Sequence, residues 1–159
     1  MISIADLLQI FEQSALAVAI RQSTWLYPVL EIVHIIGIVL LVGPAFMFDL
    51  RILGFSKHLP VGGLERHLLP WSMRGLFLII PSGIMLFMTN AGALGYDPVF
   101  WIKMTLLVVA ACNALVFHRF ILRSLPKDKV ALPVAAKVVA VLSLVLWVSV
   151  IACGRLLAY

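Results

Sequence analysis

The sequence predicts an all-α integral membrane protein, a four-helix bundle preceded by an amphipathic interfacial helix. Hydrophobic residues make up 64% of the 159 positions and charged residues only 12%, a composition that a water-soluble fold of this size could not bury. The apolar residues also gather in four runs. Each run is long enough, at about 1.5 Å per helical residue, to cross a hydrocarbon core of roughly 30 Å. Residues 1–159 are therefore expected to form a single membrane domain.

The first segment, residues 3–20, is predicted to be a helix that lies along the membrane surface. Its apolar residues recur at helical spacing on one side, and Asp6 and Glu12 lie on the other. Ser3 is the expected N-cap, with Asp6 at the capping-box position. Because no basic stretch precedes the first apolar run, a cleaved signal peptide is not expected here.

Four membrane spans are predicted after this helix. The first is expected to stop at the triplet Asp49-Leu50-Arg51, and the second to kink at Pro81, where the backbone lacks a donor. A turn-rich segment from Asn90 to Pro98 separates the second span from the third. The predicted spans cover residues 25–48, 68–90, 99–121 and 134–157.

The basic residues are unevenly divided between the two ends of the predicted bundle. One end holds only Arg21, Lys103 and Arg155. The positive-inside rule therefore places the other end, with both connecting loops, in the cytoplasm and both termini outside. The net charge of +5 forms no continuous basic face with interleaved aromatics, so nucleic acid is not an expected partner. The loop end has nine of the twelve Lys and Arg residues: Arg51, Lys57, Arg66, Arg74, Arg119, Arg123, Lys127, Lys129 and Lys137.

Polar residues inside the spans are the candidate functional residues. Counting residues from the span ends puts Glu31, Lys103 and Arg155 at one level near the outer face. His34 lies one turn below Glu31, on the same helical face as Tyr27. Unpaired charges at this depth cost about 2.5–3.5 kcal/mol each, so they are expected to turn inward and meet. The sequence thus predicts an outward-facing polar cluster of these five residues.

Two interpretations of this cluster remain open. In the first, it is a structural salt-bridge network, with His34 as a hydrogen-bonding core residue. In the second, His34 is an axial ligand of haem b, and Gly37 one turn on leaves open space for the macrocycle. Lys103 and Arg155 would then pair with the haem propionates. Glu31 would orient the histidine or balance the two cations.

Other side chains could complete a metal or haem site. His67 and His118 lie at similar depth on antiparallel neighbouring spans, where they could ligate a second haem or another metal. His67 fits a solvated loop end equally well. Met85 and Met88 lie in the right layer for a sixth ligand to iron bound at His34, although gap-filling is the more usual role of methionine.

Several other classes of site find no support in the sequence. A di-iron site needs more inward carboxylates than the Glu31-x-x-His34 pattern supplies. No Ser-His-Asp arrangement, phosphate-binding glycine loop or metalloprotease motif is present. Cys112 and Cys153 lie in apolar runs at different depths, which predicts packing roles rather than a disulfide or zinc site. A proton or ion pathway stays open, because such pathways use ionisable residues within membrane bundles.

Five stretches, spread along the chain from Trp25 to Tyr159, carry a family resemblance. They are Trp25 to Gly37, Phe48 to Arg51, Leu68 to Trp71, Lys103 with Asn113, Ala114, Phe117 and His118, and Gly154 to Tyr159. On these stretches the chain resembles an uncharacterised family of small four-span bacterial inner-membrane proteins. The segment His-Ile-Ile-Gly (His34 to Gly37) is also similar to the first helix of the copper-resistance D type and protoporphyrinogen-oxidase J type membrane proteins. The latter are haem b proteins, so the resemblance implies a b-type haem on His34.

The function expected from these observations is haem b binding with electron transfer, or the membrane anchor of a redox complex. The alternative is a cofactor-free protein, either a scaffold subunit or a small proton-coupled transporter, that uses the same cluster. A third class is an enzyme acting on a lipid or quinone, for which the sequence offers no nucleophile. Expected partners are membrane lipids, with a redox partner subunit, a quinone or a second copy of the chain as alternatives.

Overall fold

The chain folds into helices. The computed structural model describes residues 3–56, 58–121 and 133–157, and every regular element within these ranges is a helix. The predicted all-α class is confirmed. The elements are α1 Ile4–Glu12, α2 Ala15–Gln22, α3 Leu26–Leu53, α4 Val61–Thr89, α5 Ala91–Tyr96, α6 Pro98–Val116, the π-helical turn η1 Phe117–Ile121, and α7 Val134–Leu156. Four of the basic residues assigned to the loop end lie outside the described ranges: Lys57, Arg123, Lys127 and Lys129. Ala158 and Tyr159, the last two residues of the stretch from Gly154 to Tyr159, also lie outside them.

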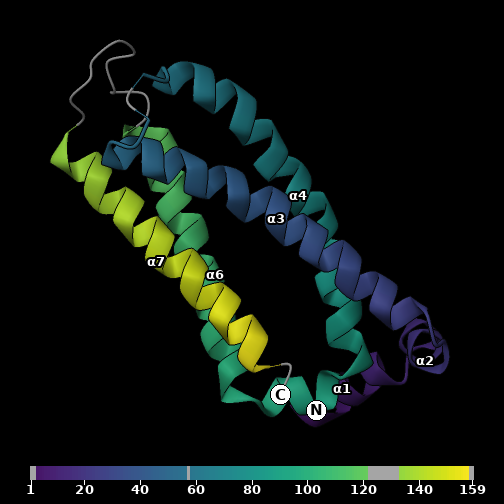
Figure 1. Cartoon of the computed structure of the whole chain (residues 1–159). Coiled ribbons are helices and arrows are strands. Elements are labelled where there is room, and N and C mark those ends of the chain that lie inside the picture. The colour runs from purple at the N-terminus through teal and green to yellow at the C-terminus, as the bar shows by residue number, and fades with distance from the viewer. Residues whose placement is uncertain (1–2, 57, 122–132, 158–159) are drawn as a thin grey trace.

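Four helices are long and apolar enough to cross a membrane: α3, α4, α6 with the first part of η1, and α7. Only 6–22% of the most apolar window of each is buried, so most of their apolar surface is available to lipid. Figure 1 shows the four helices as one elongated body with both ends of the chain at the same end. We call this the terminal end, and the opposite one, where α3 leads into α4, the loop end.

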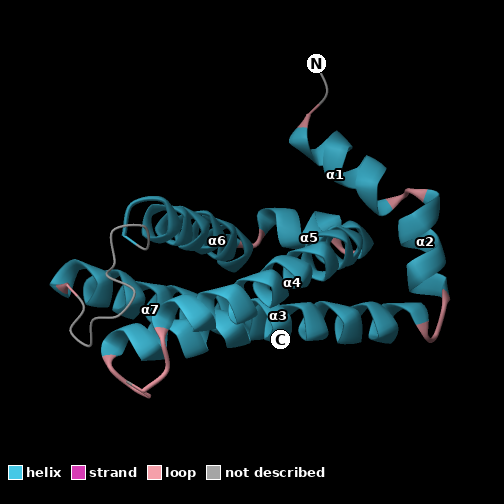
Figure 2. Cartoon of the chain, turned by 90° about the horizontal axis from the view of Figure 1, so that it is seen from above, coloured by secondary structure: helices cyan, strands magenta, loops and turns pink. Residues whose placement is uncertain are grey.

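The long helices form two pairs. α3 packs along α4, α6 packs along α7, and contacts between α3 and α7 join the two pairs. α4 and α6 meet at the terminal end, where the rings of Phe87 and Phe100 stack with centroids 5.2 Å apart, and the short α5 connects the two helices. Figure 2 shows the same arrangement from above, with α1 and α2 leading off to one side of the long helices. The α3–α7 contact and this pair of rings therefore join the two helix pairs.

The hydrophobic core lies at the loop end, where all four long helices contribute. Phe48 of α3 meets Phe117 of η1 edge to face, with ring centroids 5.7 Å apart. Ala136 and Ala140 of α7 are fully buried, and such small residues let helix backbones approach closely in membrane proteins. The remaining buried members are Ile52 and Val61.

Glycines let α3 and α4 approach at mid-length. A Cβ added at Gly75 of α4 would lie 2.7 Å from the Leu41 nitrogen and 2.8 Å from the Gly37 carbonyl oxygen of α3. A Cβ added at Gly37 would in turn lie 2.8 Å from the side chain of Ile79. The two backbones therefore touch where neither residue has a side chain, as in other close-packed membrane helix pairs.

The N-terminal segment confirms the predicted cap but not the predicted single helix. The Ser3 backbone N–H donates to the Asp6 carboxylate at 2.8 Å, which lowers the pKa of Asp6, and the Asp6 N–H donates to the Ser3 hydroxyl at 3.1 Å. The prediction of one helix over residues 3–20 is wrong, because the segment breaks after Glu12 into α1 and α2. The Ser14 hydroxyl donates to the Phe11 carbonyl and caps α2 through the Ala17 N–H, and these bonds compete with a continuous helix.

Three polar contacts attach α1 and α2 to the terminal end of the bundle. The Gly92 N–H of α5 donates to the Glu12 carboxylate at 2.9 Å. The Arg21 guanidinium donates to the Thr89 carbonyl at 3.0 Å and to the Glu12 carbonyl at 2.6 Å. The α1–α2 segment therefore contacts the corner between α4 and α5, while Ile4, Ile10 and other apolar side chains of α1 stay exposed.

We expect Arg21→Ala to loosen α1 without unfolding the bundle. The variant removes the only guanidinium of the N-terminal segment and both of its bonds to backbone carbonyls. For exposed charge-assisted bonds this costs about 1 kcal/mol, which corresponds to roughly fivefold faster amide exchange in α1. Hydrogen exchange followed by mass spectrometry measures it. The matched control is Gln22→Ala at the exposed neighbouring position, and equal exchange in the two variants would refute the anchoring role.

The first two long helices extend beyond their predicted limits. α3 runs through Asp49 and Arg51 to Leu53, and it ends at Gly54, which has a φ of 109° that favours glycine. The triplet was expected to stop the span at the membrane surface, but Asp49 and Arg51 are buried, with 7% and 5% exposure. Both side chains are therefore surrounded by packed helices at the loop end and not by solvent. α4 likewise begins at Val61, seven residues before the predicted start.

α4 remains a single helix at the predicted kink, whereas the predicted turn segment contains a helix. α4 continues through Pro81 as one helix, and Figure 1 shows it curving along its length. The segment expected to be turns between Asn90 and Pro98 contains α5. The Ala, Gly and Leu residues of this segment form the short helix, and Gly95 within it lies against the Leu8 side chain of α1. Asp97 then caps α6 by accepting from the Val99 N–H at 2.7 Å.

Candidate functional site

His34 lies between α3 and α4, in the half of α3 nearer the terminal end. Its Nδ1 is 2.9 Å from the hydroxyl oxygen of Ser82, which is 2% exposed. The Ser82 hydroxyl has one proton, and it donates that proton to the Leu78 carbonyl at 2.5 Å. The donor and acceptor roles of Nδ1 and the Ser82 hydroxyl depend on the imidazole tautomer. In the tautomer with its proton on Nδ1, that nitrogen donates to Ser82 and Nε2 is unprotonated.

The glycine beside the imidazole is Gly83 of α4 and not Gly37. A Cβ at Gly83 would lie 3.1 Å from Cε1 of His34, so the ring edge that carries Nδ1 rests on the α4 backbone. Gly37 is buried against Leu78 and Ile79. The expectation that Gly37 leaves open space for a macrocycle is wrong, because the α4 helix occupies that space.

Lys103 reaches the same region from α6. Its ammonium group acts electrostatically on the His34 imidazole. The Nζ atom lies 3.7 Å from the position that a Cβ of Gly154 would take on α7, and it is also close to Cys153. The missing side chain of Gly154 thus gives the Lys103 amine room against α7. The structure therefore brings His34 and Lys103 together from different helix pairs.

Glu31 and Tyr27 of the predicted cluster do not join this pair. Glu31 is exposed, and its carboxylate interacts with the Tyr27 hydroxyl one turn earlier on α3. Within the described part of the chain, no ion pair joins Glu31 to Lys103. Arg155 is exposed at the end of α7. The reason is rotational, since positions three apart on a helix differ by about 60° and His34 faces α4 while Glu31 does not.

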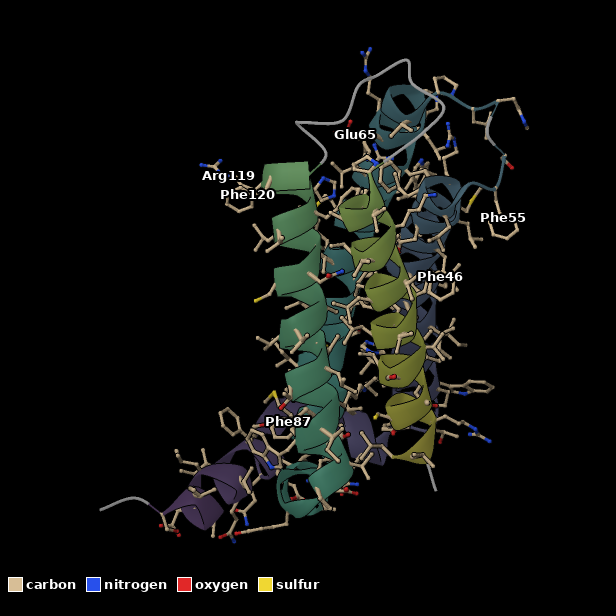
Figure 3. The ribbon with its side chains drawn as sticks, turned by 90° about the vertical axis from the view of Figure 1, so that its left-hand side faces the viewer. Phe46, Phe55, Glu65, Phe87, Arg119 and Phe120 are labelled. Carbon is tan, nitrogen blue, oxygen red and sulfur yellow. The ribbon has the colours of Figure 1, made fainter. Side chains whose placement is uncertain are left out.

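At the loop end, the residue brought near His118 is Glu65. The carboxylate of Glu65, in the first turns of α4, acts electrostatically on the half-buried His118 imidazole of η1. Figure 3 shows Glu65 at this end of the bundle, with Arg119 and Phe120 extending away from it. His67 is exposed and lies two residues after Glu65, roughly 200° around the helix. The structure does not bring His67 to His118.

Asp49 is a buried polar residue that the sequence reasoning assigned only to the end of a span. Its carboxylate accepts from the Ser143 hydroxyl of α7, and its Oδ2 atom is buried with no hydrogen-bond partner. The sequence signal that could have identified it is its position inside an apolar run, one residue after Phe48 and three before Ile52. A charge in such a run points either to a membrane boundary or to a functional group.

Additional ligands for iron or another metal are sparse. Within the described ranges, no group of three or more His, Cys, Asp or Glu residues is placed to hold a metal ion. Met85 and Met88 are half-buried on α4. Cys112 is an exposed free thiol on α6, and Cys153 is a buried free thiol on α7. The chemistry available near His34 is therefore one imidazole nitrogen, one ammonium group and apolar surface.

One protein-family model covers nearly the whole chain, matching residues 10–159. The chain belongs to the family of unknown function DUF6644. Membership of DUF6644 agrees with the resemblance to small uncharacterised four-span proteins. Neither the curated proteins nor the solved structures contain a match to this chain. The similarity of the DUF6644 chain to the copper-resistance D and protoporphyrinogen-oxidase J types therefore remains a prediction based on the short segment His34 to Gly37.

Proposed function

We propose that the protein binds haem b through Nε2 of His34 and transfers electrons within a membrane, alone or as the anchor of a redox complex. Haem b bound there would supply a one-electron iron couple. Its partner would be a redox subunit or a quinone. The chain itself would supply the axial nitrogen, a cation for a propionate, and an apolar environment that sets the potential.

The observation that carries the proposal is the hydrogen bond between His34 Nδ1 and the buried Ser82 hydroxyl. Histidines that ligate metals almost always donate their second ring N–H to a neighbouring acceptor, which fixes the tautomer and the ring plane. Ser82 can accept this bond from His34 in the tautomer with its proton on Nδ1, since the Ser82 hydroxyl then donates to the Leu78 carbonyl. That tautomer leaves Nε2 unprotonated, as a metal ligand requires.

The residues around His34 fit part of what haem b needs. Lys103 supplies a cation from α6 whose charge already acts on the imidazole, which suits a propionate. The space expected beside Gly37 is filled by α4, so the macrocycle would have to lie away from that contact. Arg155, Glu31 and Tyr27 would lie farther out, as partners at the edge of the site.

The packing at Gly37 favours the alternative function, a cofactor-free scaffold or small proton-coupled transporter. If α4 stays against Gly37, then His34 and Lys103 form a polar contact between helix pairs with no cofactor between them. Such a contact would fix the register between the helices or take part in proton transfer through the bundle. The two functions differ in a property that is easily seen, because only a haem protein is coloured.

The absorption spectrum of the purified full-length chain tests the proposal. We expect a Soret band that shifts on addition of dithionite, with about one b-type haem per chain in a pyridine haemochrome assay. Incubation of the preparation with haemin distinguishes a protein that lost its haem during purification from one that has no haem site. A folded, helical preparation that stays colourless and does not take up haemin would contradict haem binding and favour the cofactor-free alternative.

We also propose that the protein resides in a bacterial inner membrane with both termini outside. The uneven distribution of Lys and Arg supports this orientation, and the shared position of the two termini at one end of the bundle agrees with it. A Gln13→Cys variant in intact cells provides the test. Labelling by an impermeant maleimide is expected, and labelling only after the cells are opened would reverse the orientation.

A further inference from the structure

Asp49 combines deep burial with an incomplete set of partners. It lies on α3 facing α7, and its side chain is 7% exposed. One carboxylate oxygen accepts from the Ser143 hydroxyl, and Oδ2 has no partner among the described residues. A buried carboxylate with one oxygen unpaired is among the most costly groups that a bundle can hold, whereas the neutral acid is far cheaper.

Among the residues that the structure describes, no opposite charge acts on Asp49. On α4, Arg66 and Arg74 are exposed, and Arg74 lies over the Trp71 ring at 4.7 Å. On α7, Lys137 is exposed. The Glu65 carboxylate and the His118 imidazole act on each other, as described above.

Arg51 is the buried cation nearest to Asp49 in the sequence. Its Nε donates to the Leu59 carbonyl at 2.7 Å. Residues two apart on a helix point in directions about 160° apart, so the Arg51 side chain leaves α3 on the other side from Asp49. Phe48, the residue before Asp49, packs edge to face against Phe117 in the apolar core at this end of the bundle.

We propose that Asp49 is a proton-binding site, and that the carboxyl group holds its proton while α3 and α7 are packed together. A metal cation fits this position less well. Hard cations take six or more oxygen ligands, and the described surroundings offer the Asp49 carboxyl and the Ser143 hydroxyl. A proton needs only the unpaired oxygen Oδ2.

This site is separate from the proposed haem site. Asp49 follows His34 by fifteen residues, about 22 Å along α3. It lies at the loop end, in the contact that joins the two helix pairs. Gain and loss of its proton would therefore act on the α3–α7 contact and not on the His34 pair. The inference holds whether or not the chain binds haem.

Labelling with dicyclohexylcarbodiimide tests the inference, because this reagent modifies protonated carboxyl groups in apolar surroundings. The full-length chain in detergent would be treated at pH 6, and the modified residue located by peptide mass spectrometry. We expect Asp49 to be labelled and the exposed carboxyl groups of Asp6 and Glu31 to stay unlabelled. Sodium chloride at high concentration should not protect it, and protection by sodium would assign the site to that cation instead.

The stability of Asp49→Asn gives a second readout that does not depend on access of the reagent. Asparagine mimics the neutral acid, so the variant should match the wild type at acidic pH, where the wild-type carboxyl is protonated in both states. As the pH rises, the wild type should lose thermal stability relative to the variant, since folding then requires an ionised carboxyl to regain a proton. Glu65→Gln is the matched control and should retain label at Asp49. A variant that is less stable than the wild type at every pH, with no label on the wild-type Asp49, would overturn the proposal.

Discussion

Gly75→Ala should separate α3 from α4 over their central turns. The added methyl group would lie within 2.7–2.8 Å of the Leu41 nitrogen and the Gly37 carbonyl oxygen, and both are backbone atoms that cannot rotate away. Overpacking of this kind costs about 1–3 kcal/mol, and Gly75→Leu should cost more. Unfolding titrations in mixed micelles, followed by circular dichroism, measure the loss. We also expect the His34–Ser82 contact to weaken, because the same helix pair positions both residues.

Gly43→Ala is the matched control for this prediction. Gly43 lies on α3 six residues after Gly37, and a Cβ there would meet nothing within 4 Å. Alanine has a higher helix propensity than glycine by about 1 kcal/mol, so this variant should be as stable as the wild type or slightly more stable. Equal destabilisation by the two substitutions would show that the close approach of α3 and α4 is not what Gly75 provides.

The sequence was sufficient for the class of fold because membrane spans are set by length and hydrophobicity, which each helix carries by itself. The bounds of α7 and the start of α6 were predicted to within about a residue for this reason. The bounds of α3 and α4 were not. The charges at Asp49 and Arg51 indicated a membrane boundary, whereas tertiary packing buries both of them. The break at Ser14 was missed because a serine hydroxyl can cap a new helix as readily as it can sit within one.

The candidate site was predicted only in part, because depth along a helix can be counted but the direction of a side chain depends on its neighbours. Counting placed His34 and Lys103 at compatible depths, and the structure brings them together. It also grouped Glu31 with them, although Glu31 interacts with Tyr27 on its own helix. No role for Ser82 or Gly83 was predicted from the sequence. Their roles beside His34 depend on the register of α4 against α3, which one sequence does not specify.

Substitutions at His34 and Ser82 should reduce haem binding to different degrees if His34 is the ligand. His34→Ala removes the imidazole proposed to bind iron, so the Soret band of the purified protein should disappear. Ser82→Ala keeps the imidazole but removes the acceptor for its Nδ1–H. Loss of such a supporting hydrogen bond typically weakens metal affinity 10–100-fold, so haem should bind but dissociate readily. Haemin titration followed at the Soret band measures both effects.

Two variants separate this assignment from general damage to the bundle. Ser72→Ala is matched to Ser82→Ala, since the Ser72 hydroxyl of α4 also bonds across to α3, at 3.2 Å from the Leu41 carbonyl, but it touches no histidine. His118→Ala removes an imidazole at the loop end instead. Both should bind haem as tightly as the wild type. Should a coloured His34→Ala protein retain its haem while His118→Ala loses it, the iron would be at the loop end, and the hydrogen bond from His34 to Ser82 would have only a structural role.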